Sequence, residues 1–71
     1  MKIYPSPYIE TDKSMQIMIM DDPSGDGKEV YYRIAGWPFV FAFGLPSKYS
    51  MFEVIHYARC NADYYSEVLF K

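Results

Sequence analysis

The sequence predicts an α+β fold, with a three-stranded antiparallel sheet and a C-terminal helix packed on one face. Alternating and hairpin-like apolar patterns fill the middle of the 71-residue chain, and we expect strands near 15–21, 28–35 and 39–44. Apolar residues at helical spacing follow from residue 50 onward. We expect one domain over residues 1–71, because a chain of this length builds a single hydrophobic core.

Residues 1–13 are expected to form an extended N-terminal arm. Pro5 and Pro7 exclude a helix there, and each favours an extended backbone at the residue before it. Residues 2–4 could add a short edge strand. The apolar side chains of the arm, Ile3, Tyr4, Tyr8 and Ile9, are expected either to cover the core or to meet a partner. Covering the core is favoured, since a small domain needs every apolar group that it has.

The first predicted strand, 15–21, is apolar on both faces. Side chains alternate along a strand, so one face carries Met15, Ile17 and Ile19, and the other carries Gln16, Met18 and Met20. The second face is therefore either covered as well or exposes methionine, a residue that fills cores and also recurs at binding surfaces.

The segment 21–28, DDPSGDGK, is predicted to be a hairpin connection with a local negative patch. Two more specific interpretations fail. A calcium-binding loop that starts at Asp22 would have Arg33 where a bidentate glutamate belongs. A phosphate-binding loop that ends at Lys28 would have Asp22 in place of its first glycine, and no helix follows it.

The stretch 28–45 is predicted to be a hairpin closed by a two-residue turn at Gly36-Trp37. That turn would pair Ile34 with Phe39, Tyr32 with Phe41, and Val30 with Phe43, and would place all six on one face. The opposite face would carry Tyr31 and Arg33, with Val40 and Ala42 across from them.

A C-terminal helix is predicted to begin after Ser50. Ser50 and Glu53 have the spacing of a capping box. The apolar residues that follow recur every three or four positions, namely Met51, Val54, Ile55, Ala58, Ala62, Tyr65 and Leu69. This period favours one helix that reaches about Phe70. The alternative is a final strand at 64–70, because Asn61 and Asp63 are poor helix formers.

One group of residues on this helix has side chains that could carry chemistry. Glu53, His56 and Cys60 are spaced to lie next to one another on the helix surface. A cysteine nucleophile would also need an oxyanion hole and a pocket, and two soft ligands make only half of a tetrahedral metal shell. We therefore expect no enzymatic activity, no metal and no cofactor.

Composition restricts the classes of partner and compartment. The net charge of −2 is too small and of the wrong sign for a general nucleic-acid binder. The single cysteine, Cys60, excludes an internal disulfide and is typical of a reducing compartment. The start of the chain has no signal-peptide pattern, and its longest apolar run, 34–46, is too short to span a bilayer. We expect a soluble cytoplasmic protein that does not bind membranes.

Aromatic residues make up 20% of the chain, including eight tyrosines, more than one small core can bury. Interfaces are enriched in tyrosine, tryptophan, phenylalanine, methionine and arginine. The sequence therefore favours a protein partner. The candidate contact residues are Trp37, Arg33, Tyr31 and Tyr57, and Trp37 is the strongest because a tryptophan on a tight turn is hard to bury. The alternative for Trp37 is that its ring folds back over the end of the sheet.

In size and composition the whole chain resembles the small inhibitors encoded by phages and mobile elements, such as anti-CRISPR and host-takeover proteins. No motif contributes to this resemblance. It implies a protein that acts without catalysis by occluding a surface of a larger bacterial complex. Two alternatives are a homo-oligomeric structural or accessory protein, possible as a homodimer, and a binder of single-stranded nucleic acid that stacks bases on sheet aromatics.

Overall fold

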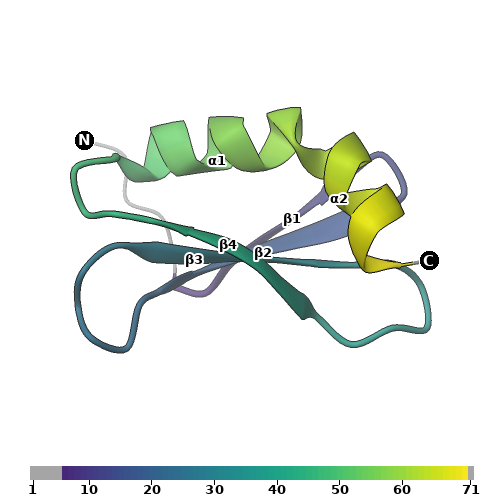
Figure 1. The fold of residues 1–71 in the computed structure, drawn as a ribbon, viewed down its shortest axis with the longest axis horizontal. Coiled ribbons are helices and arrows are strands. Elements are labelled where there is room, and N and C mark those ends of the chain that lie inside the picture. The colour runs from purple at the N-terminus through teal and green to yellow at the C-terminus, as the bar shows by residue number, and fades with distance from the viewer. Residues whose placement is uncertain (1–5, 71) are drawn as a thin grey trace.

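A four-stranded antiparallel sheet covered on one face by two helices makes up the computed structural model, which describes residues 6–70 (Figure 1). Each strand pairs with the next one along the chain. The elements are β1 (Tyr8–Asp12), β2 (Met15–Asp21), β3 (Lys28–Arg33), β4 (Val40–Leu45), α1 (Met51–Cys60) and α2 (Ala62–Leu69). The predicted α+β class is confirmed, whereas the predicted numbers of strands and helices are wrong.

Strand β1 corrects the prediction of an extended arm over residues 1–13. The restriction that prolines impose ends at Pro7, and the next five residues pair with β2 from Tyr8↔Ile19 to Asp12↔Met15. The last pair closes a two-residue turn, in which Lys13 adopts a positive φ of 58°. The edge strand considered for residues 2–4 lies outside the described residues.

The loop between β2 and β3 is the predicted hairpin connection. The carboxylate of Asp22 accepts hydrogen bonds from the backbone N–H and the hydroxyl of Ser24, both at 2.8 Å. These bonds lower the pKa of Asp22. Gly27 has a φ of +104°, and a Cβ there would lie 2.1 Å from the carbonyl oxygen of Leu45. Only glycine fits this close approach of the two chain segments.

The connection between β3 and β4 is longer than the predicted two-residue turn. It spans residues 34–39, and its tight part is a β-turn closed by a bond of 3.0 Å from the Trp37 N–H to the Ile34 carbonyl. Gly36 is the third residue of that turn and has a φ of +83°, the position at which a type II turn requires glycine. Strands β3 and β4 are therefore shorter at this end than a tight hairpin would make them.

The register between β3 and β4 is correct at one pair and wrong beyond it. Val30 lies opposite Phe43 as predicted, but the register then shifts, so that Tyr31 lies opposite Phe41 and Tyr32 opposite Val40. The extra residue on β4 is a β-bulge, which changes the face to which the following side chains point. The prediction that Phe41 shares the buried face with Tyr32 is therefore wrong. The predicted pair Ile34–Phe39 lies outside both strands.

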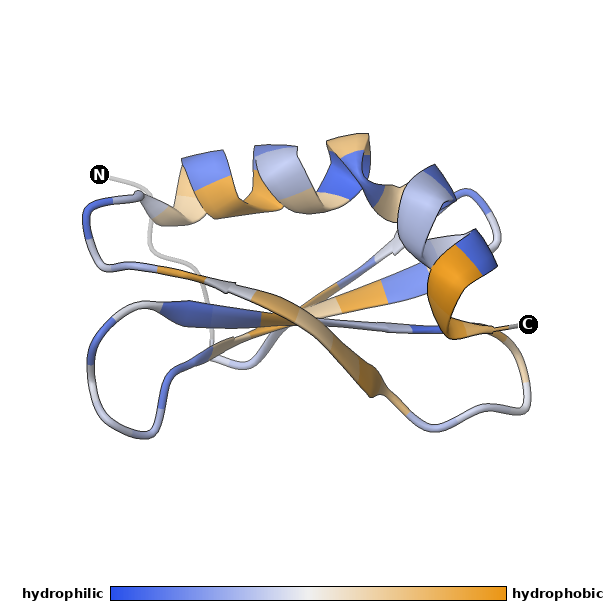
Figure 2. Ribbon diagram, viewed as in Figure 1, coloured by the Kyte–Doolittle hydropathy of each residue, from blue (hydrophilic) through white to orange (hydrophobic). Residues whose placement is uncertain are grey.

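The core lies between the sheet and the helices. Its buried residues are Met15, Ile17, Ile19, Val30, Tyr32, Val54, Ile55, Ala58 and Ala62. Figure 2 shows the apolar side of α1 facing the sheet and its polar side facing away. The predicted stripe is confirmed, because its remaining members Met51, Tyr65 and Leu69 pack against this core. The capping box is also confirmed, with Glu53 N–H donating to Ser50 Oγ at 3.2 Å and Ser50 N–H donating to the Glu53 carboxylate at 2.9 Å.

The helical region is broken at Asn61, so the prediction of one continuous helix is wrong. Asn61 has φ −100° and ψ 5°, and its side-chain amide donates to the Tyr57 carbonyl at 2.8 Å. Such a side chain competes with the backbone for the last carbonyls of a helix. After the break, Tyr65 of α2 stacks on Tyr32 and on Phe43, each with a centroid distance of 5.4 Å. The alternative of a final strand at 64–70 is also wrong, because residues 62–69 are helical. Neither helix in the described part of the chain is long and apolar enough to cross a membrane.

Candidate functional site

The sheet face opposite the helices carries a row of apolar side chains that crosses all four strands. Backbone pairing places Ile9 beside Met18, Met18 beside Tyr31, and Tyr31 beside Phe41. Ile9 and Phe41 are each 50% exposed. The rings of Tyr31 and Phe41 meet edge to face at 5.5 Å. We call Ile9, Met18, Tyr31 and Phe41 the apolar row, and the sheet surface that carries it the open face.

A hollow of about 270 Å³ lies along one side of the apolar row, two residues further along the strands. It is lined by Thr11, Ser14, Gln16, Arg33, Ile34 and Ala35, and we call it the Arg33 hollow. The guanidinium of Arg33 donates through Nε to the side-chain oxygen of Gln16 and lies over the ring of Phe39 at 5.1 Å. These two contacts fix the orientation of the guanidinium at the edge of the hollow.

The other side of the apolar row, toward the β2–β3 loop, is acidic. Glu29 lies two residues before Tyr31 on β3, and its carboxylate accepts a hydrogen bond of 3.1 Å from the Tyr31 hydroxyl. That bond raises the pKa of Tyr31. The loop beyond Glu29 adds Asp22 and Asp26, whereas Lys28 is paired with Asp21 at 2.7 Å. The open face thus has a cation at one end, apolar residues in the middle and carboxylates at the other end.

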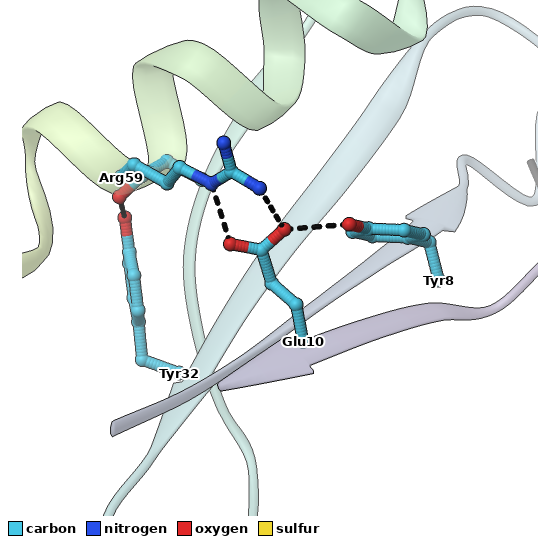
Figure 3. A network of polar contacts seen from close by, with 5 residues as sticks. Tyr8, Glu10, Tyr32 and Arg59 are labelled. Atoms are coloured by element: carbon cyan, nitrogen blue, oxygen red, sulfur yellow. Dashed lines mark hydrogen bonds and ion pairs between the residues drawn. The ribbon is translucent and has the colours of Figure 1, made fainter. Parts of the chain in front are cut away.

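The helix-covered side holds the sheet in place through buried and half-buried polar contacts (Figure 3). Tyr32 points into the core from β3, and its hydroxyl donates to the Ala58 carbonyl of α1 at 2.7 Å. Burial raises the pKa of Tyr32. This bond satisfies two polar groups inside the protein and fixes the distance between α1 and the centre of the sheet.

A second contact ties α1 to the edge strand β1 (Figure 3). Arg59 donates from Nε and Nη2 to the two carboxylate oxygens of Glu10, at 2.6 and 2.8 Å. The Tyr8 hydroxyl donates to the same carboxylate at 2.6 Å. The hydrogen bonds from Arg59 are the main cause of the lowered pKa of Glu10, and the hydrogen bond to Glu10 is the main cause of the raised pKa of Tyr8. The edge strand is thereby held against the helix layer.

The structure brings together two of the four predicted contact residues. Tyr31 and Arg33 share the open face, as strand alternation predicts. Trp37 lies in the β3–β4 loop, 42% exposed, with its ring edge-to-face against Phe70 at 5.4 Å. Tyr57 lies on α1, on the other side of the sheet, and contacts Tyr49 and His56. These four residues therefore do not form one surface.

Of the three residues on α1 whose side chains could carry chemistry, two lie in contact and the third is bonded elsewhere. Cys60 Sγ lies 3.6 Å from His56 Nε2, and both residues are exposed. The Glu53 carboxylate is instead bonded to the backbone of Ser50. Within residues 6–70, no three histidine, cysteine, aspartate or glutamate side chains are placed to hold a metal ion.

The apolar row contains three residues that the sequence did not identify as contacts. Met18 had a signal, since the strand 15–21 is apolar on both faces. Ile9 could be placed only by recognising β1, and Phe41 only by recognising the bulge in β4. The helices also expose apolar residues, Phe52, Tyr64 and Val68 among them, but scattered apolar residues are normal on a protein surface. The open face differs because its apolar residues are contiguous and are flanked by polar groups.

Comparison of the chain with protein-family models, with curated proteins and with solved structures found no match.

Proposed function

We propose that this chain is a non-enzymatic protein-binding module that contacts its partner through the open face. The observation that carries the proposal is the apolar row, which crosses four strands and has half-exposed side chains at both ends. Contiguous apolar surface with a polar rim is typical of interaction sites. Tyrosine, phenylalanine, methionine and arginine, the residues gathered here, are the types in which interfaces are enriched.

The support beneath this face favours binding. The side chains of the apolar row project from paired strands, and the sheet is fixed to the helices by the Tyr32–Ala58 and Arg59–Glu10 contacts. A surface held in this way loses little conformational entropy when a partner covers it. The residues of the row offer contact area, and none of their side chains is an acid, a base or a nucleophile at neutral pH.

For the partner, we propose a surface of a bacterial defence or host complex, which the chain would inhibit by occlusion. This part of the proposal rests on the resemblance in size and composition to inhibitors encoded by phages and mobile elements. The open face supplies the means, since an exposed apolar sheet surface can cover a functional site without chemistry.

A selection from a library of random 12-residue peptides displayed on phage tests the proposal. The wild-type chain should enrich peptides, and Phe41→Lys should weaken their binding at least tenfold, because it replaces an exposed apolar ring of the apolar row with a charge. Phe52→Lys is the matched control, since Phe52 is 71% exposed on the helix layer, and it should leave binding unchanged. Failure to enrich any peptide, or equal binding by Phe41→Lys, would refute the proposal.

Self-association is a second candidate function, favoured by the layout of charge on the open face. Arg33 and Glu29 lie four residues apart on β3, on either side of Tyr31. In two copies packed face to face about a two-fold axis, each arginine would lie near the glutamate of the other copy. Sedimentation equilibrium at micromolar concentration tests this candidate, and a strict monomer would exclude it.

A further inference from the structure

Arg33 differs from the other basic residues of the described chain in its surroundings. Lys13, Lys28 and Arg59 each pair with a carboxylate, and Lys48 lies over the ring of Tyr49. Arg33 has contacts with Gln16 and Phe39, and its two terminal nitrogens make no hydrogen bond within residues 6–70. The guanidinium therefore keeps donors available, in a fixed orientation, at the edge of the Arg33 hollow.

The chemistry around these donors selects a small planar anion. A guanidinium binds a carboxylate through two parallel hydrogen bonds, and one that is already stacked and oriented loses little freedom on binding. Thr11 and Ser14 line the same hollow and provide hydroxyl groups that can also donate to an anion. The hollow opens beside the apolar row, so a residue next to the bound anion would lie over Met18 and Tyr31.

An extended polyanion fits this face poorly. Among the described strand residues whose side chains lie on the open face, Arg33 is the one basic residue. Glu29 lies about 13 Å away along the same strand, at the strand rise of roughly 3.3 Å per residue. Asp22 and Asp26 follow in the adjoining loop. A nucleic-acid backbone that contacted Arg33 and crossed the apolar row would meet these carboxylates.

We infer that the Arg33 hollow binds one carboxylate of a partner polypeptide, an aspartate or glutamate side chain whose apolar neighbour packs on the apolar row. The inference rests on the proposed function and specifies the partner sequence that the open face recognises. Charge complementarity supports it, since Arg33 is an arginine without a carboxylate partner in the described chain and stands beside an otherwise apolar surface.

The peptides selected on the wild-type chain provide the probe. They should carry an acidic residue next to an apolar one, and replacing that acid by its amide should weaken binding about tenfold. On Arg33→Met the same replacement should have no effect, as expected when the two groups interact directly. Arg33→Lys should restore only part of the preference, because lysine lacks the planar fork. Lys48→Met removes the same charge from another surface and should keep the full preference.

Each other outcome has a defined meaning. Selected peptides without an acidic preference, or loss of the preference in Lys48→Met, would overturn the inference while leaving the protein-binding proposal intact. Equal binding of the peptides by Phe41→Lys would refute the protein-binding proposal itself.

Binding of the oligonucleotide (dT)12 that depends on Arg33 would show that the hollow binds phosphate. A wild-type dimer that Glu29→Gln converts to a monomer would assign it to a second copy of the chain. Thermal melts of all variants confirm that each is folded.

Discussion

Tyr31 and Tyr32 are neighbours on β3, and the two faces of the sheet give them different roles. Tyr32 is fully buried, stacks on Tyr65 and donates its hydroxyl to a helix carbonyl. Tyr31 lies on the open face, meets Phe41 edge to face and donates to the partly exposed carboxylate of Glu29. The same residue type thus stabilises the fold on one face and offers contact area on the other. The difference arises from which face the helices cover.

The largest effect expected from this difference comes from a matched pair of isoleucines on neighbouring strands. Ile19 is fully buried, whereas Ile9 is 50% exposed. Ile19→Ala should lower the free energy of unfolding by about 3 kcal/mol, because it removes buried methyl groups and leaves a cavity under the helices. Ile9→Ala should cost less than about 1 kcal/mol. Urea denaturation measures both, and equal losses would show that the open face is covered as well as the helix-covered face.

Substitution of Trp37 tests whether this loop residue belongs with the core or with the exposed surface. Its ring is partly covered by Phe70, so Trp37→Ala should cost about 2 kcal/mol of stability, between the values for core and surface residues. Phe52→Ala provides the control, because Phe52 is the most exposed large apolar residue on the helices, and it should cost under about 1 kcal/mol. A loss for Trp37→Ala no larger than that for Phe52→Ala would place Trp37 at the surface, free for a partner.

A smaller effect should separate the two tyrosine hydroxyls. Tyr32→Phe leaves the buried Ala58 carbonyl without its donor and should cost about 1.5 kcal/mol. Tyr31→Phe removes a hydroxyl near the surface, where water can replace it, and should lower the stability much less than Tyr32→Phe. Calorimetric melts of the two variants measure the difference. A reversed order would mean that the hydrogen bond between Tyr31 and Glu29 contributes more than the buried one.

The helix-covered face was largely predictable from the sequence, because its pattern is local. The alternation in β2 predicted the bounds of that strand, and the spacing from Met51 to Leu69 predicted which helix residues face the core. The break at Asn61 was visible only as a weak helix former. The direction that the chain takes after the break goes with the packing of Tyr65 against Tyr32 and Phe43, which are far away in the sequence.

The open face was less predictable because it depends on a β-bulge and on an edge strand, and both leave little local pattern in the sequence. Phe39, Phe41 and Phe43 alternate as one buried set would, and the bulge in β4 moves Phe41 to the other side of the sheet. Strand β1 carries Glu10 and Asp12 on its helix-facing side, so it lacks the apolar alternation of a half-buried strand. Its Glu10 carboxylate is bonded to Arg59, which lies 49 residues away along the chain.

The ion pair between Arg59 and Glu10 gives the smallest predicted effect and tests how β1 is held. The Glu10 side chain is 13% exposed, and the hydrogen bonds from Arg59 hold its pKa below the ordinary value of 4.5. A lowered pKa means that the folded state binds this proton less readily than the unfolded state. The stabilisation is therefore complete above pH 4.5 and is lost as the pH falls through the lowered pKa of the folded state. Because Arg59 is itself more than half exposed, we expect a contribution of only about 1 kcal/mol.

Urea denaturation at pH 7 and pH 3 should show Arg59→Met less stable than wild type at pH 7 and nearly equal to it at pH 3. Lys13→Met, which breaks the exposed pair with Asp63, should differ little from wild type at either pH. An Arg59→Met deficit that persists at pH 3 would show that Arg59 stabilises β1 through packing of its side chain and not through the charge of Glu10.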